Sequence, residues 1–311
     1  MNFNKLKIWA VTDGSQGMIS QVIGLSQQLS KNITYIKTDL IFPWNKLQPG
    51  FLPIYKWIFK NKIPEYEKPD MIISCGRKSV YFSLYCKKKF YKLINVHIQN
   101  PKTSPKQFNY IISPNHDNFY GNNVLNSVGA LHQFTKSNHK INSKLLTCII
   151  GGDNQHYYFG YKEVIKLCNK LIKLKKNHAN LDLQVITSRR TSVLVKKIIN
   201  QKLNNIANIW NGDGNNPYEE AIKISSFFIV TSDSTSMISE AAISGRPIYI
   251  FHLPFKRKSL RISSFHSEFK KLGITRDLEK VNKLVNWKYN LLNESERIGS
   301  ILKKRIIEDN L

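Results

Sequence analysis

Apolar residues follow two alternating patterns along this chain. Short runs rich in β-branched residues predict strands in the first half at residues 7–11, 33–37, 71–74, 93–98 and 110–113. Between them, apolar residues spaced three or four positions apart predict helices at residues 19–29 and 79–85. Strands that alternate with helices in this way are typical of βαβ units and parallel sheets.

The same alternation begins again in the second half. Strands are predicted at residues 145–150, 182–187, 208–210, 227–231 and 247–251, and helices at residues 162–175, 192–203, 217–225 and 236–244. The polar, aperiodic stretch at residues 136–143 predicts a linker. The sequence therefore predicts an α/β protein with two Rossmann-like domains, at residues 1–138 and 144–287. A helical pattern begins at Asn286, and a helix over residues 288–311 is expected to pack back on the first domain.

The composition first suggests a nucleic-acid partner and then argues against one. The 311 residues include 47 Lys and Arg against 21 Asp and Glu, which gives a formal net charge of +26. Only 9 of the basic residues are Arg and 38 are Lys. Partners that bind phosphates and base edges favour Arg, whose planar guanidinium fits them better. We therefore attribute most of the charge to a lysine-biased genome, and we expect no specific nucleic-acid partner because no zinc motif, RNP block or Arg-rich helix is present.

The cysteines and the apolar runs indicate a compartment. The four cysteines are scattered, so the sequence predicts neither a disulfide framework nor a metal site and favours the cytoplasm. The apolar run at residues 8–11 is too short for a signal peptide, and no run is long enough to span a membrane. We expect a soluble protein that is peripheral at most, on the inner face of a membrane.

Two loops of the first domain follow predicted strands and precede helices, where ligands of parallel sheets bind. The first contains Asp13, Gly14, Ser15, Gln16 and Gly17, and the second contains Gly76, Arg77 and Lys78. Asp13 is the only carboxylate of its loop and is the candidate general base, although an ordinary helix cap explains it equally well. Two cations at a helix start oppose the helix dipole, which favours an anion there. Asn100 follows a neighbouring strand, and His116 beside Asp117 is either a proton-transfer pair or a turn cap.

Three loops of the second domain contain residues suited to a nucleoside diphosphate. Gly151 and Gly152 follow its first strand, and Ser188 and Arg189 follow the next one, where the alternative is a solvated helix start. The third loop opens a helix with Ser234, Thr235 and Ser236, whose hydroxyl and N–H groups can bind phosphate oxygens. Glu240 lies one helical turn further on, close enough to accept hydrogen bonds from a ribose diol. The alternative is an N-cap cluster followed by a surface glutamate.

Several sequence blocks together resemble one family. VTDGSQGMISQVIGLSQQL, PDMIISCGRKS, HIQNP, LLTCIIGGDNQHY, ITSRRTS and FIVTSDSTSMISEAAISGRPIYIF occur here in the order typical of the elongated-mitochondria (ELM) fission family, whose bacterial members have been labelled epimerase-like. The last block is also similar to the donor-site motif of GT-B glycosyltransferases. That resemblance implies two domains that face each other across a cleft. It also assigns the diphosphate to the Ser/Thr-rich helix start and the ribose to Glu240.

The resemblance implies a function and several alternatives. We expect a nucleotide-sugar-dependent glycosyltransferase-like protein with an inverting, metal-independent transfer, no cofactor beyond its nucleoside-diphosphate-sugar substrate, and a lipid-linked or envelope acceptor. Arg77 and Arg189 are the expected partners of the diphosphate. The alternatives are a nucleoside-diphosphate-sugar epimerase and a non-catalytic adaptor that retains the fold. This chain has Asp13 and Gln16 where envelope GlcNAc transferases carry a histidine that has been considered as the base.

Two basic segments bear on membrane contact. Residues 51–62 (FLPIYKWIFKNK) mix aromatic residues with lysines and could form an amphipathic helix at an anionic membrane surface. The alternative is a helix packed on the core with its lysine side chains reaching solvent. Residues 252–261 contain four Lys and Arg and could close over phosphates or touch anionic lipid.

Overall fold

The computed structural model describes residues 2–64, 67–136 and 139–311. The chain divides into two compact units. Unit 1 comprises Met1–Phe134 and Asn293–Leu311, and unit 2 comprises Thr135–Leu292. Positions 137 and 138 of the expected linker lie outside the described residues. Each unit is built around one parallel six-stranded sheet, which confirms the predicted α/β class.

Unit 1 has the strand order β2-β1-β3-β4-β5-β6, with every neighbouring pair parallel. The strands are β1 (Ile8–Thr12), β2 (Ile33–Lys37), β3 (Met71–Cys75), β4 (Ile94–Ile98), β5 (Tyr110–Pro114) and β6 (Val124–Ser127), and the helices are α1 (Gln16–Leu29), α2 (Arg77–Lys89) and α8 (Glu294–Glu308). Strands β1, β3, β4 and β5 are buried along their whole length, because helices cover both faces of a parallel sheet.

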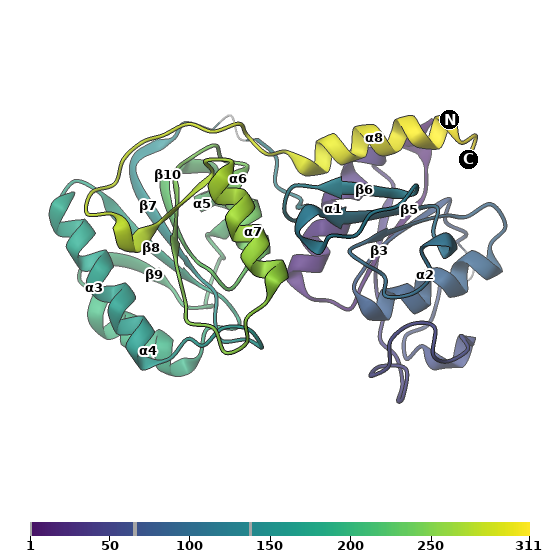
Figure 1. Ribbon diagram of the computed structural model, residues 1–311, viewed down its shortest axis with the longest axis horizontal. Helices are drawn as coiled ribbons and strands as arrows, with labels where there is room; N and C mark the ends of the chain where they lie inside the picture. The colour runs from purple at the N-terminus through teal and green to yellow at the C-terminus, as the bar shows by residue number, and fades with distance from the viewer. Residues whose placement is uncertain (1, 65–66, 137–138) are drawn as a thin grey trace. The chain divides into compact units, whose positions relative to one another are not determined.

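Alternate residues of the unit 1 strands meet different helices. Ile8 and Ala10 pack in one cluster with the apolar faces of α1 and α8, whereas Trp9 and Val11 pack in another with the apolar face of α2. The C-terminal helix lies close against α1 (Figure 1), and a Cβ atom at Gly299 would approach the Cβ atom of Gln28 to 2.6 Å. The last helix is therefore a structural part of the N-terminal unit.

Unit 2 has the strand order β12-β11-β10-β7-β8-β9, again parallel throughout. The strands are β7 (Asn142–Ile150), β8 (Asp182–Thr187), β9 (Ala207–Trp210), β10 (Ser225–Thr231), β11 (Ile248–Phe251) and β12 (Thr275–Asp277), and the helices are α3 (Tyr161–Asn177), α4 (Val193–Leu203), α5 (Tyr218–Ile224), α6 (Thr235–Ala242) and α7 (Leu260–Lys271). The sheet grows in opposite directions from β7, toward β8 on one side and β10 on the other. This switch point is where ligands of doubly wound sheets bind.

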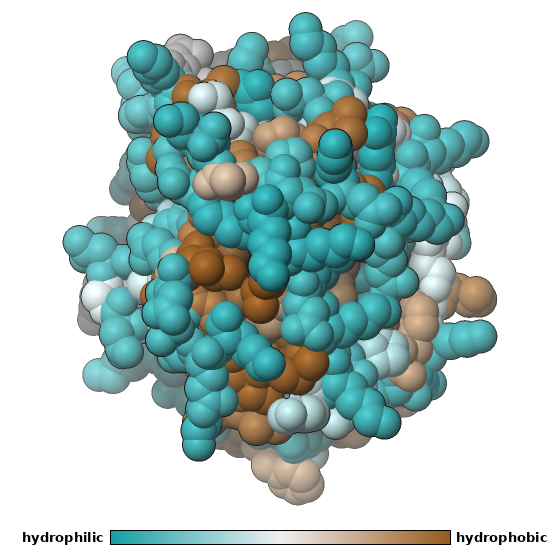
Figure 2. Space-filling view, turned by 90° about the vertical axis from the view of Figure 1, so that its left-hand side faces the viewer, coloured by the Kyte–Doolittle hydropathy of each residue, from teal (hydrophilic) through white to brown (hydrophobic). Residues whose placement is uncertain are grey.

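The surface of unit 2 reflects its lysine content. The buried stripe of α3 consists of Val164, Leu167, Cys168, Leu171 and Leu174, and lysines occupy much of the rest of the helix. Figure 2 looks onto the left-hand side of Figure 1, where α3 lies, and hydrophilic side chains cover most of that face around a hydrophobic area. All four cysteines are buried thiols.

One predicted helix is absent, and the predicted C-terminal helix begins later, at Glu294. Residues 51–62 form an irregular segment with one short 3-10 turn, Lys56–Ile58, because Pro53 interrupts the segment and its carbonyl accepts a hydrogen bond from the Trp44 indole. Residues 286–293 are not helical either, because the Trp287 indole donates to the Gly273 carbonyl at 2.7 Å and Tyr289 donates to the Arg246 carbonyl at 2.9 Å. Strand β7 also begins within the predicted linker. The sequence reading missed β6, α7 and β12.

Candidate functional site

A pocket of about 420 Å³ lies at the carboxyl edge of the unit 2 sheet. Its walls come from the loop after β7, the loop and helix start after β10, and the first turn of α7. The lining residues are Asn154, Gln155, His156, Asp233, Thr235, Ser259, Arg261 and Ile262. Polar side chains, one arginine and the N-terminal end of α6 therefore face the same space.

Asp233 organises this edge of the sheet. Its side chain is fully buried and accepts hydrogen bonds from the Gly152 amide at 3.0 Å and the Thr231 hydroxyl at 2.6 Å. The Arg190 guanidinium forms an ion pair with the same carboxylate at 2.8 Å, and 40% of the Arg190 side chain is exposed. A buried carboxylate is stable only when such partners replace its water. Asp233 thus joins the loops that follow β7, β8 and β10.

The paired glycines are required by this arrangement. A Cβ atom at Gly151 would lie 2.1 Å from the Asp233 carboxylate, and one at Gly152 would lie 2.0 Å from the Arg190 carbonyl oxygen. The Gly151 amide donates to the Thr231 hydroxyl at 2.8 Å. Both glycine amides thus donate within the protein. Because the two glycines have no side chains, the neighbouring loops can approach closely.

The loops after β7 and β11 are joined along one wall of the pocket. Tyr157 and Phe255 form an isolated antiparallel bridge, and their rings stack with centroids 4.7 Å apart. Asn154 accepts hydrogen bonds from the amides of His156 and Tyr157 and donates to the Asp233 carbonyl. The loop is therefore fixed both to the basic segment at residues 252–261 and to the Asp233 network.

The start of α6 combines exposed hydroxyls with a buried glutamate. Ser234 caps the helix by accepting from the Met237 amide, and Ser234, Thr235 and Ser236 are partly exposed. Glu240 is buried in the second turn and accepts a hydrogen bond of 2.6 Å from the Tyr218 hydroxyl of α5. Burial, together with the Glu240 charge, raises the pKa of Tyr218 well above its usual value. Tyr218 therefore donates to this carboxylate as a neutral phenol.

The cations near the pocket differ in their surroundings. Arg189 is exposed, and the neighbouring Ser188 hydroxyl accepts the Arg190 amide within the turn after β8. Arg261 lines the pocket from the first turn of α7. Deeper in α7, His266 hydrogen-bonds the Ser232 carbonyl at 2.9 Å, and burial lowers the pKa of His266 to about 4. The ring is therefore neutral near pH 7.

The first loop of unit 1 is a tight turn at the carboxyl edge of β1. The Asp13 carboxylate accepts the Ser15 amide at 3.0 Å, and Gly14 has a positive φ of 97°. Gln16 is exposed at the start of α1, and the Gly17 carbonyl accepts from the Gln21 side chain. Asp13 is half-buried here, with one carboxylate oxygen in the turn.

Arg77 and Lys78 have partners inside unit 1. The Arg77 guanidinium donates to the carbonyls of Trp44, Asn45 and Leu47, and the Lys78 ammonium forms an ion pair with Asp39 at 2.6 Å. Gly76 precedes them with a φ of 93°. These contacts account for two cations at a helix start without a bound anion.

Asn100 and His116 lie at the same edge of the unit 1 sheet. Asn100 accepts the Lys102 amide at 2.9 Å within its own turn. His116 is buried in a 3-10 turn after β5, with its Nε2 atom 3.7 Å from an Asp117 oxygen. Because β3 and β4 separate β1 from β5, the loops of Asp13 and His116 are not adjacent in the sheet.

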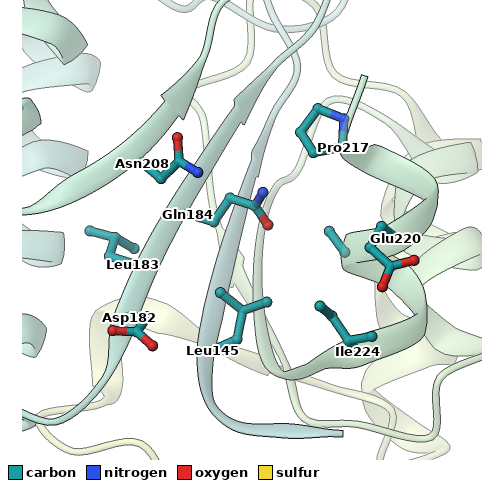
Figure 3. A pocket seen from close by; sticks show the side chains of 9 residues that line it. Leu145, Asp182, Leu183, Gln184, Asn208, Pro217, Glu220 and Ile224 are labelled. Carbon is teal, nitrogen blue, oxygen red and sulfur yellow. The ribbon is translucent and has the colours of Figure 1, made fainter. Parts of the chain in front are cut away.

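A second, smaller pocket of unit 2 lies away from these loops. It measures about 180 Å³ and opens between α5 and the strands β7 and β8 (Figure 3). Leu145, Ile224 and Pro217 supply apolar walls, and Asp182 and Glu220 stand at its rim. It contains none of the residues that the sequence suggested for chemistry.

The sequence comparisons now identify the family. Residues 16–306 match the sequence family described as mitochondrial fission ELM1. The chain belongs to this family. It is 29% identical to an uncharacterized protein of Rickettsia prowazekii (strain Madrid E), over 96% of this chain and 98% of that protein. It is 23% identical to the mitochondrial fission protein ELM1 of Arabidopsis thaliana, over 78% of this chain and 65% of the plant protein. The family resemblance of the sequence blocks is confirmed.

Solved structures identify the fold. The chain resembles a Methanocaldococcus jannaschii UDP-GlcNAc 2-epimerase in complex with UDP-GlcNAc and UDP, with a TM-score of 0.52, 15% identity, and coverage of 96% of this chain and 99% of that one. It also resembles S. aureus MnaA in a co-structure with UDP, with a TM-score of 0.53, 12% identity, and coverage of 98% of this chain and 88% of that one. The glycotransferase of kitacinnamycin matches with a TM-score of 0.52, 9% identity, and coverage of 96% of this chain and 99% of that one. The chain therefore has a GT-B-type fold. None of its described helices is long and apolar enough to cross a membrane.

Sequence reasoning missed the residues that organise the pocket. Asp233 stands among hydroxyl residues in the sequence and is not predicted as a site residue, although a carboxylate directly after a buried strand is unusual and indicates buried partners. The sequence places Arg261 only within a basic segment, because the pattern does not predict the helix that positions it. No local sequence pattern indicates the role of Tyr218, since its hydrogen-bond partner Glu240 lies 22 residues away.

Proposed function

We propose that this protein binds a nucleoside-diphosphate sugar in the unit 2 pocket and transfers the sugar to an acceptor hydroxyl. The observation that carries the proposal is the pocket of about 420 Å³ at the switch point of the sheet, whose lining includes both Thr235 at the start of α6 and Arg261. Its volume lies within the range of about 300–1,000 Å³ that is common for small-molecule sites. The UDP complexes of proteins with this fold support the same ligand class.

Each group of residues has a proposed role. The diphosphate lies at the N-terminal end of α6, where Ser234, Thr235 and Ser236 offer hydroxyl groups and the helix dipole favours an anion. Arg261, with Arg189 from the turn after β8, balances the diphosphate charge. Glu240, held by the Tyr218 hydroxyl, accepts hydrogen bonds from the ribose. The close approach of the loops at Gly151 and Gly152 shapes the floor of the unit 2 pocket.

The proposed reaction is an inverting transfer. A base removes the proton from the acceptor hydroxyl as its oxygen attacks the anomeric carbon, and the bond to the nucleoside diphosphate breaks. Arginine and the helix N-terminus stabilise the charge on the departing diphosphate, which is the role that a metal ion plays in other transferases. Asp13 is the proposed base and His116 the weaker alternative. A lipid-linked or envelope molecule is the proposed acceptor.

Nucleotide binding is tested first, by thermal unfolding with UDP, GDP, UDP-GlcNAc and GDP-sugars. A ligand present at 100 times its Kd stabilises the folded state by about 2.7 kcal/mol. We expect Arg261→Gln to reduce the stabilisation by the bound nucleotide. Arg257→Gln should not, because Arg257 belongs to the same basic segment but does not line the pocket. No stabilisation by any nucleotide would refute the proposal.

An epimerase is the second candidate, because the fold is shared with a UDP-GlcNAc 2-epimerase. An epimerase converts its sugar nucleotide without an acceptor, whereas a transferase without acceptor shows only slow hydrolysis. Proton NMR of UDP-GlcNAc incubated with the protein distinguishes the two. A non-catalytic adaptor would keep its biological activity in both Asp13→Asn and Glu240→Gln variants.

A further inference from the structure

The segment between β2 and β3 exposes an unusual set of aromatic side chains. We call residues 39–64 the aromatic loop, which leaves the lower part of unit 1 in Figure 1. Phe42 is 76% exposed and Phe51 is 75% exposed, and Tyr55 and Trp57 are each about half exposed. Single exposed apolar residues are common, but a group of large ones on one segment marks an interaction surface.

The backbone of the aromatic loop is held from within unit 1. The Arg77 guanidinium binds three of its carbonyls, and the Tyr81 hydroxyl donates to the Gln48 carbonyl at 2.8 Å. Ile58, Phe59 and Ile63 are buried in the core beside α2. The exposed rings are thus carried by a segment that is fixed to the core at several points.

The exposed rings are organised as a platform. The Trp57 ring stacks on Tyr55 with centroids 5.8 Å apart and meets the Trp44 ring edge-on at 5.0 Å. Trp44 itself is buried, and its indole donates to the Pro53 carbonyl. Trp57 therefore rests on a buried aromatic side chain and keeps much of its surface open to solvent.

The net charge of the aromatic loop is positive. Lys46, Lys56, Lys60 and Lys62 are exposed. Asp39 is the only acidic residue between positions 39 and 64, and it is paired with Lys78 and Lys60. These lysines hold the pKa of Asp39 well below its usual range. The surface thus presents aromatic rings within a field of positive charge.

We infer that the aromatic loop docks unit 1 on an anionic lipid surface. Trp and Tyr prefer the boundary between lipid headgroups and acyl chains, and lysines beside them are attracted to anionic headgroups. A second copy of this chain would bring the same lysines face to face. Protein interfaces favour Arg over Lys, and no Arg lies in this segment. The inference does not depend on nucleotide binding by unit 2.

Vesicle co-sedimentation tests this inference with the full-length protein. The vesicles contain phosphatidylcholine and phosphatidylglycerol in equal amounts, or phosphatidylcholine alone. We expect binding to the anionic vesicles that weakens as salt rises, and little binding to the neutral ones. The double variant Phe42→Ser/Phe51→Ser should lower the partition coefficient about tenfold or more, because two large apolar side chains no longer enter the lipid.

Tyr91→Ser is the matched control. Tyr91 is 80% exposed in unit 1, with the Lys92 ammonium over its ring, but it lies outside the aromatic loop. Its replacement should change vesicle binding by less than about twofold. Circular dichroism melting and nucleotide-induced stabilisation, measured on the same variants, separate loss of docking from loss of folding. Equal binding by the double variant and the wild type would overturn the inference. So would a wild-type protein that binds neither vesicle, which would point to a protein partner instead.

Discussion

Replacing the Asp233 carboxylate with an amide should destabilise unit 2 strongly. Asp233→Asn keeps the shape of the side chain but removes its charge and turns one acceptor oxygen into a donor. The two buried hydrogen bonds from Gly152 and Thr231 are each worth about 1.5–3 kcal/mol when the acceptor is charged. The ion pair with the partly exposed Arg190 adds at most about 1 kcal/mol. Because the asparagine keeps one acceptor oxygen, we expect the free energy of unfolding to fall by about 2–4 kcal/mol.

Thermal and urea unfolding of three variants measure this effect. A loss of about 3 kcal/mol lowers the Tm of a domain of this size by about 6–12 °C. Arg190→Met should cost about 1 kcal/mol or less, because that side chain is partly solvated. Asp182→Asn is the control, since Asp182 is exposed on the same unit. Asp233→Asn within about 0.5 kcal/mol of wild type would refute the reasoning. An equal cost for Arg190→Met would show that the ion pair dominates instead.

Three further predictions follow from the site and the core. The pKa of His266 is about 4 in the folded state against 6.5 for the free side chain, so the unfolded chain binds more protons between these values and stability falls as the pH falls through this window. His266→Gln should remove up to about 3 kcal/mol of that acid destabilisation, which urea unfolding at pH 7 and pH 4 would detect. An unchanged difference in the free energy of unfolding between the two pH values would contradict this prediction. The four buried thiols should resist a thiol reagent in the native protein and all react after unfolding. The reason is that burial raises the pKa of Cys86 to about 12 and of Cys168 to about 11, so little reactive thiolate forms. Rapid labelling of the native protein would count against this packing. Tyr218→Phe should weaken UDP binding roughly fivefold to tenfold in calorimetry, since Glu240 loses the hydroxyl that orients it, and unchanged affinity would separate Glu240 from the nucleotide.

The central strands of both sheets are predictable because burial on two faces leaves continuous apolar runs. The bounds of β2 and β8 agree with the prediction at both ends. The short edge strands β6 and β12 lack such runs, and α7 buries only Phe265 and Phe269, which is too weak a periodicity to recognise. Residues 51–62 of the aromatic loop are predicted to form a helix because their alternating bulky and basic residues imitate an amphipathic pattern. Its real conformation depends on Arg77, a contact across more than thirty positions of the sequence.

The candidate site was predictable only where a local motif carried it. The Ser/Thr-rich start of α6 follows from a strand, a turn and a helix in sequence, so the sequence alone located it. The function of Gly151 and Gly152 could not be found in this way. Their Cβ positions are closed by Asp233 and by the Arg190 backbone, and both contacts join segments far apart in the chain. Loop packing of this kind leaves no periodic signal.

The positions of the arginines explain why net charge alone was a poor guide to the ligand. Arg77 binds backbone carbonyls and Arg190 binds a buried carboxylate, so both of these cations are already matched by protein groups. Arg261, which the sequence grouped with a lysine-rich run, is the arginine that lines the unit 2 pocket. An arginine that stabilises the fold and an arginine that lines a pocket look identical in a sequence, and only the structure separates them. Arg261→Gln and Arg257→Gln are therefore the pair of variants that tests the proposed nucleotide site.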